Sequence, residues 1–169
     1  TVRMMLSRPA GNANFAGTAI DFPGTEQLDP GRLAATCRVA VSACPSSSIY
    51  GHVKALSPLF AKPLTGPVYL HRSKGRLPEL VAALRGSLTF DLRGRLGFAD
   101  GRMRVTMKSI PDLPVSRLDL TIAGGKRGLL INNRNLCRRP SFADAKVTAQ
   151  NSKAVTRHPK LAVPCTVPG

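Results

Sequence analysis

The chain has 169 residues, enough for one domain that buries about two thirds of its unfolded surface. Its hydrophobic fraction of 43% excludes a disordered chain, because such chains lack the apolar area that offsets the entropy lost on folding. Twenty-five Lys and Arg against nine Asp and Glu give a net charge of +16. This charge indicates either an anionic partner or a solvated surface whose repulsion keeps the molecules in solution. No apolar run is long enough to span a membrane.

The first 22 residues contain two extended segments, residues 2–6 and 13–22, which Pro9, Gly11 and Asn12 separate. This pattern predicts a strand-loop-strand unit. We expect the first segment to pair either with the protein's own sheet or with an exposed sheet edge of a neighbouring copy. The domain prediction is a single β domain over residues 1–169, with residues 1–22 as strands available to a neighbouring subunit.

Within residues 23–84, one short helix is predicted first, and strands follow it. Asp29 is an N-cap and Pro30 the first helical position of a helix that ends near the first cysteine. Residues 48–58 alternate as a strand, and a second strand is expected to start at Val68, because Pro67 cannot donate to a central ladder. Residues 77–84 fit either a short helix or a strand.

Residues 87–108 predict the most regular hairpin of the chain. One parity of its first strand is apolar and the other is polar, and the pattern resumes after the turn at residues 99–101. The apolar parity comprises Leu88, Phe90, Leu92, Leu96, Phe98, Met103, Val105 and Met107. Arginine dominates the opposite parity, so the outer face of this hairpin is expected to be strongly basic.

Further short strands are predicted at residues 117–122 and 146–150, with a glycine turn at residues 124–125. The whole chain then holds about eight to ten strands with one or two short helices. The predicted fold class is mainly β: an antiparallel β-sandwich, Ig-like or jelly-roll-like.

The four cysteines predict disulfides. They form no CxxC pair, and the spacing of Cys37, Cys44 and His52 is unlike that of the usual zinc ligands, so no metal site is predicted. Three pairings are possible, and we predict Cys37 with Cys44 and Cys137 with Cys165. Paired cysteines indicate an oxidising compartment, hence an extracellular or cell-surface location.

No constellation of side chains points to catalysis or to a cofactor. The acids at residues 91, 100, 112 and 119 lie on separate predicted strands and turns, and the three histidines have no consistent spacing. Residues 123–130 lack the order of a phosphate-binding loop and fit a turn better. With no Trp and two Tyr, aromatic platforms for specific nucleic-acid or sugar recognition are scarce. We therefore predict a non-enzymatic protein.

Several short motifs resemble a module found in large exported proteins of actinobacteria. They include ACPSSSIYG, PLTGPVYL and LPELVAALRG in the first half of the chain, and PDLPVS, GGKRGLLIN and NLC in the second half. The similarity covers roughly residues 30–165. It implies export, disulfides and an all-β fold, but no settled activity. This chain carries more arginine and lysine than that module is expected to have.

The outer face of the hairpin is the predicted interface. Arginine pairs with carboxylate or phosphate through a planar two-point contact that lysine does not offer. The residues expected to share this face are Arg93, Arg95, Arg102, Arg104, Lys108 and Arg117. The predicted function is a secreted structural or adhesive subunit that assembles into a filament or layer through strand pairing and Arg-carboxylate contacts. The alternative is a monomeric module that binds an anionic extracellular polymer, such as a cell-wall polymer.

Overall fold

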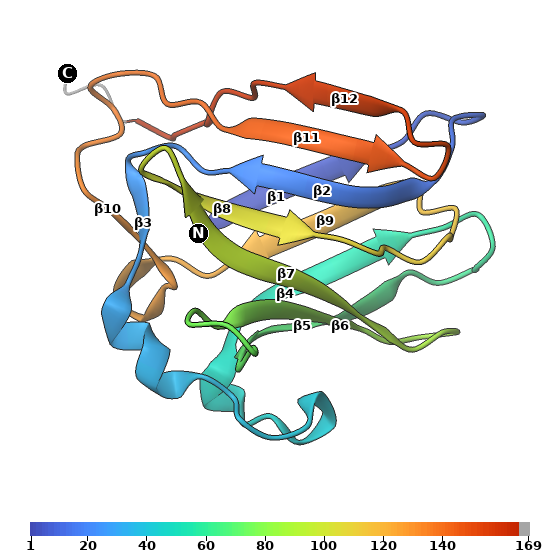
Figure 1. Cartoon of the computed structure of the whole chain (residues 1–169), viewed down its shortest axis with the longest axis horizontal. Helices are drawn as coiled ribbons and strands as arrows, with labels where there is room; N and C mark the ends of the chain where they lie inside the picture. The colour runs from blue at the N-terminus through green and yellow to red at the C-terminus, as the bar shows by residue number, and fades with distance from the viewer. Residues whose placement is uncertain (166–169) are drawn as a thin grey trace.

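Ten of the strands form one antiparallel sheet in the computed structural model, which describes residues 1–165 (Figure 1). Their order across the sheet is β1-β9-β4-β5-β6-β7-β8-β2-β11-β12, and β3 and β10 form a separate pair. The strands are β1 (Val2–Ser7), β2 (Phe15–Asp21), β3 (Glu26–Leu28), β4 (Ile49–Leu56), β5 (Leu64–His71), β6 (Glu79–Leu84), β7 (Phe90–Ala99), β8 (Arg102–Met107), β9 (Arg117–Ile122), β10 (Leu130–Asn132), β11 (Asp144–Ala149) and β12 (Ala154–Arg157).

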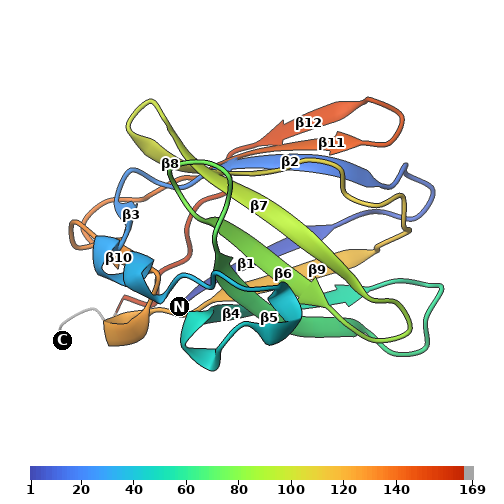
Figure 2. The same cartoon turned by 60° about the horizontal axis from the view of Figure 1, so that its bottom comes forward.

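The sheet curls into a half-barrel, so that strands from its two halves face each other across the core (Figures 1 and 2). The mainly β, antiparallel fold class is therefore confirmed, although both layers belong to one continuous sheet. Alternate residues point into the core, as period-two patterns require. The core includes Leu64, Val68, Leu70, Leu84, Leu92, Leu96, Val105 and Ile122, all less than a tenth exposed.

The arginine-rich hairpin forms as β7 and β8, with Leu96 opposite Val105 and Phe98 opposite Met103. The inward parity is buried over most of its length, but Phe98 is 62% exposed, and Leu88, which precedes β7 and was predicted to share this parity, is 45% exposed. The neighbouring strand β6 ends its pairing with β7 at Arg95, so no strand of the described part of the chain lies beside the end of the hairpin on that side. The inward prediction for Phe98 is wrong for this reason.

The predicted helix after Asp29 is a 3-10 helix, η1 (Pro30–Ala35), and the Asp29 carboxylate accepts the Gly31 N–H at 2.9 Å. Three further 3-10 turns follow: η2 (Val41–Ala43), η3 (Ser46–Ser48) and η4 (Gly125–Arg127). Within residues 1–165, therefore, no helix has the length to cross a membrane.

Strand β5 begins earlier than predicted and contains Pro67, which lies opposite His52 of β4. On the other side, β5 pairs with β6 at Val68↔Ala82 and again at Thr65↔Arg85, and Pro67 lies in the interval between. Pro67 is therefore tolerated within the sheet, because the β5–β6 ladder has a local gap where its missing N–H would otherwise donate. The ambiguous residues 77–84 are resolved as strand β6.

Both predicted disulfides are present: Cys37–Cys44 and Cys137–Cys165. Cys37 is 1% exposed, and its backbone bridges to β5, since its N–H donates to the Leu70 carbonyl at 2.8 Å. Because disulfides persist in oxidising compartments, the two bonds indicate a non-cytoplasmic location.

Candidate functional site

Five of the six basic residues predicted to share a face lie close together. Arg93 and Arg95 belong to β7, Arg102 and Arg104 belong to β8, and Lys108 follows β8 directly. Gly97 lies opposite Arg104, and Arg95 lies opposite Thr106, so these side chains alternate with the buried positions and point outward. The sixth residue, Arg117, lies on β9, and strands β4, β5 and β6 separate it from β7.

Most of these arginines already pair with carboxylates of the same chain. Arg93 contacts Glu79, Arg102 contacts Asp144, and Arg117 contacts Asp119. The fourth pair has two contacts: Arg104 donates to the two Asp21 carboxylate oxygens at 2.5 and 2.6 Å. This hydrogen bonding holds the pKa of the Asp21 carboxyl below its usual value. The pKa of Asp144 is lowered by His158 and by Arg102.

These pairs leave few carboxylates for contacts with another molecule. Six of the nine acidic residues take part in ion pairs among residues 1–165, namely Asp21, Asp29, Glu79, Asp91, Asp119 and Asp144. Of the others, Asp112 accepts a hydrogen bond from Asn14 and Glu26 is buried. Within the same range, Arg95 and Lys108 take part in no ion pair, so the basic face keeps unneutralised cations.

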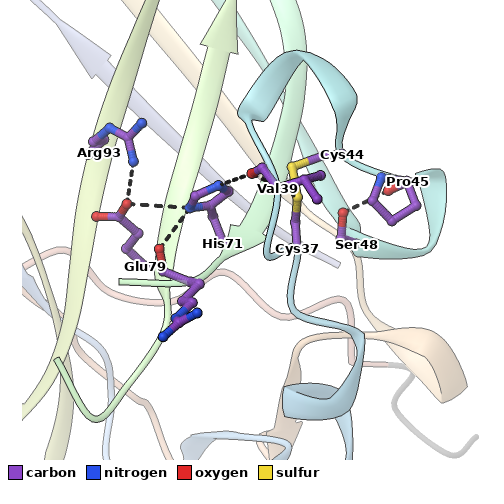
Figure 3. The surroundings of a disulfide bond; sticks show 9 residues. Cys37, Val39, Cys44, Pro45, Ser48, His71, Glu79 and Arg93 are labelled. Carbon is purple, nitrogen blue, oxygen red and sulfur yellow. Dashed lines mark hydrogen bonds and ion pairs between the residues drawn. A yellow bond between two sulfur atoms is a disulfide. The ribbon is translucent and has the colours of Figure 1, made fainter. Parts of the chain in front are cut away.

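The His71 side chain fastens the first disulfide loop to the sheet (Figure 3). Its two ring nitrogens lie 2.8 Å from the Val39 and Arg72 carbonyl oxygens, and Nδ1 lies 3.7 Å from Glu79 Oε1. The two cysteine sulfurs near His71 are bonded to each other and offer no thiolates to a metal ion. These contacts therefore link the loop after η1 to β5 and β6, and their role is structural.

A cavity of about 830 Å³ lies inside the half-barrel, between the β1–β9 half of the sheet and the β2–β11 half. Most of its lining is aliphatic, and the segment of residues 159–164 covers part of it. The apolar lining includes Met4, Leu6, Ile20, Phe22, Met107, Leu118, Leu120, Ala145, Val147, Leu161 and Val163. The alternating pattern of the strands predicted an apolar interior, but it did not predict a cavity within it.

Two buried polar side chains line this cavity, and sequence reasoning missed both. Glu26 at the start of β3 is 3% exposed, and its Oε2 atom has no hydrogen-bond partner among the described residues. Thr18 of β2 is 5% exposed, and its hydroxyl also lacks a partner there. An unpaired buried polar group costs about 1–3 kcal/mol, so both side chains differ from the buried Thr25 and Ser48, whose hydroxyls have hydrogen-bond partners.

Burial raises the pKa of the Glu26 carboxyl above its usual value of 4.5. A raised folded-state pKa means that the stabilising contribution of this group is complete below the unfolded-state pKa and is lost as pH rises through the folded-state pKa. We therefore expect Glu26→Gln to be more stable than the wild type above pH 4.5, with a difference that grows until pH exceeds the folded-state pKa of Glu26. Urea unfolding of both proteins across a pH series measures this difference, and a pH-independent difference would contradict it.

No protein-family model, curated protein or solved structure matches this chain. The resemblance to an exported actinobacterial module therefore stays a prediction.

Proposed function

We propose that the protein is a secreted, non-enzymatic adhesive subunit that assembles with copies of itself through the free edges of its sheet. The observation that carries this proposal is the strand order, in which β1 and β12 each have a single neighbouring strand among residues 1–165. An edge strand presents unpaired N–H and C=O groups that another chain can pair with. The two disulfides support an extracellular or cell-surface setting.

The backbone of β1 directs three residues toward its free edge. Arg8 N–H donates to the Ser116 carbonyl at 2.9 Å, and hydrogen-bonded positions recur at every second residue of an antiparallel ladder. Arg3, Met5 and Ser7 therefore turn their N–H and C=O groups away from β9. The Met5 side chain is 63% exposed, so an apolar surface accompanies this edge.

The backbone of β12 offers a similar edge at the other end of the sheet. Ala149 N–H donates to the Lys153 carbonyl at 2.8 Å, so the same alternation turns the backbone groups of Ala154 and Thr156 away from β11. All four residues of β12 are exposed and none is a proline. Pairing of β1 with β12 of the next copy would extend the sheet from subunit to subunit.

The charge of +16 opposes this association, because like-charged copies repel one another. Arg-carboxylate contacts between copies offer little compensation, since six of nine acids already pair within the chain. Salt screens repulsion between exposed charges, so assembly is expected to strengthen with ionic strength. This dependence has the opposite sign to that of binding to a polyanion, which weakens with salt.

A second candidate function, binding of an anionic polymer by the monomer, is favoured by the unneutralised cations of the basic face. Arg95 and Lys108 lie on the hairpin beside three ion-paired arginines. A polymer with closely spaced phosphates or carboxylates would supply the counter-charges that the chain itself lacks.

Proline at the free-edge positions tests the assembly. Met5→Pro and Thr156→Pro each remove an N–H that points away from the neighbouring strand, so the sheet itself keeps its hydrogen bonds. We expect the wild type to form larger species in sedimentation as protein concentration and salt increase. Each variant is expected to stay monomeric at concentrations about tenfold higher, a shift of about 1.4 kcal/mol in association.

Met4→Pro is the matched control, because the Met4 backbone is hydrogen-bonded to β9. Proline at this position removes a hydrogen bond within the sheet, so it is expected to lower the stability of the subunit and does not act on the free edge alone. A wild type that remains monomeric at every concentration and salt would overturn the assembly proposal. Retention of a polyphosphate by that monomer at low salt, with steep loss at high salt, would then support the polymer-binding candidate.

A further inference from the structure

We propose that the cavity of the half-barrel binds an uncharged amphiphile, a molecule with an apolar chain and a hydroxyl-bearing head. The proposal concerns the interior of the sheet and does not rest on assembly through its edges. Its volume of about 830 Å³ lies within the range of small-molecule sites in proteins, about 300 to 1,000 Å³. Such sites combine an apolar lining with a few polar groups that orient the ligand.

The lining of the cavity suits the apolar chain of the proposed ligand. Leucine, methionine, valine and isoleucine side chains from β1, β9, β2, β8 and β11 surround the cavity. Burial of each methylene of a ligand in an apolar site is favourable, so a chain of several carbons would be retained by burial alone. Methionine side chains, present here at Met4 and Met107, adapt their shape readily to such chains.

The two unpartnered side chains, Glu26 and Thr18, indicate the chemistry of the ligand's head group. The Glu26 carboxyl needs a hydrogen-bond donor, and the Thr18 hydroxyl can donate as well as accept. Hydroxyl groups both donate and accept, so a hydroxylated head satisfies either residue. Because both side chains are more than nine-tenths buried, a ligand that pairs with them removes a cost that the unliganded protein carries.

The charges around the cavity select against ionic heads. Arg3 and Lys160 line the cavity, and the protein as a whole carries +16, so a cationic head is repelled. An anionic head beside Glu26 would bring two acidic groups together in an apolar environment. The uncharged head is the one that fits both the polar groups and the charges.

Isothermal titration calorimetry with three decyl compounds tests the head-group preference in the intact, oxidised protein. The probes are 1-decanol, decanoate and decyltrimethylammonium, which share the chain and differ in the charge of the head. We expect 1-decanol to bind with an affinity about tenfold or more above either charged probe. Equal affinity for all three probes, or no measurable binding of 1-decanol, would overturn the proposal.

Variants of the polar pair test their role in that preference. Thr18→Val and Glu26→Leu each remove a polar group and are expected to weaken 1-decanol binding about tenfold, with both proteins at least as stable as the wild type to urea. The stability measurement excludes loss of fold as the cause of weaker binding. Unchanged affinity in both variants would contradict the assignment of Glu26 and Thr18.

A matched pair on β11 tests the location. Ala145 lines the cavity and Lys146, the next residue, is exposed on the opposite face of the strand. Ala145→Phe is expected to fill the cavity and abolish 1-decanol binding, while Lys146→Phe is expected to leave it unchanged. Thr156→Pro, which acts on the sheet edge, is also expected to bind normally, so failure of the assembly proposal is distinguishable from failure of this one. Binding that survives Ala145→Phe would place the ligand elsewhere and overturn the proposal.

Discussion

Gly66→Ala is expected to lower the free energy of unfolding by about 3 kcal/mol or more, as severe overpacking does. Gly66 lies on β5, and a Cβ atom there would come within 1.7 Å of the Ala83 carbonyl oxygen of β6. The obstacle is backbone, which has no rotamer to change, so the two strands would have to separate. Because β5 and β6 lie in the middle of the sheet, the effect is expected to reach the whole fold.

Gly97→Ala provides the control for this prediction. Gly97 also lies within a strand, β7, and a Cβ atom there would meet no atom within 4 Å. Alanine in place of glycine at such a site is expected to change the free energy of unfolding by less than about 1 kcal/mol, and to raise it instead of lowering it. Urea unfolding of the two variants side by side measures the difference. Equal stability of Gly66→Ala and Gly97→Ala would show that β5 and β6 do not approach each other in this way.

Loss of the second disulfide has an expected effect of similar size. Cys137 and Cys165 are separated by 28 residues, and closing such a loop contributes about 3.6 kcal/mol in the chain-entropy model. The double variant Cys137→Ser, Cys165→Ser is therefore expected to unfold at a distinctly lower urea concentration. The bond also anchors the end of the segment at residues 159–164, which covers part of the cavity.

Thermal unfolding and hydrogen exchange of the serine variant test both consequences. We expect a lower melting temperature together with faster exchange of the Leu161 amide, which donates to the Ser141 carbonyl at 2.8 Å. The double variant Cys37→Ser, Cys44→Ser serves as comparison, because its shorter loop predicts about 2.5 kcal/mol and lies away from the cavity. Unchanged exchange at Leu161 would show that other contacts hold this segment.

The inward and outward positions of most strands were predictable from the sequence. On β7, the alternation of Leu92 and Leu96 with Arg93 and Arg95 requires only that one face is buried and the other is wet. The prediction failed at Phe98, because alternation specifies a face but does not reveal where a neighbouring strand ends. It failed at Pro67 for a similar reason, since a gap in one ladder accommodates the missing N–H.

The partners of the outward arginines were not predictable. Arg104 contacts Asp21 across a sequence separation of 83 residues, because β2 inserts between β8 and β11. Local patterns carry no information about which strands become neighbours, since that order is settled by the packing of the whole sheet. As a result, a face that appeared to offer free arginines mostly holds pairs within the chain.

The burial of Glu26 illustrates the same limit. In the sequence it lies in a polar stretch after Pro23 and Gly24, where a charged residue is usually exposed. Only the pairing of β3 with β10 brings it to the cavity, where its carboxyl is desolvated. No signal within the neighbouring residues could have identified it.

From the sequence alone, period-two burial was enough to predict the antiparallel all-β class and the inward or outward side of most strand residues. The cysteine pairing was predicted correctly as one of three possible pairings. The tertiary structure alone decided the strand order, the two free edges, the internal ion pairs and the cavity with its two unpartnered polar groups. The physical reason is that contacts between residues far apart in the chain depend on how the whole sheet curls, and no local pattern encodes that curvature.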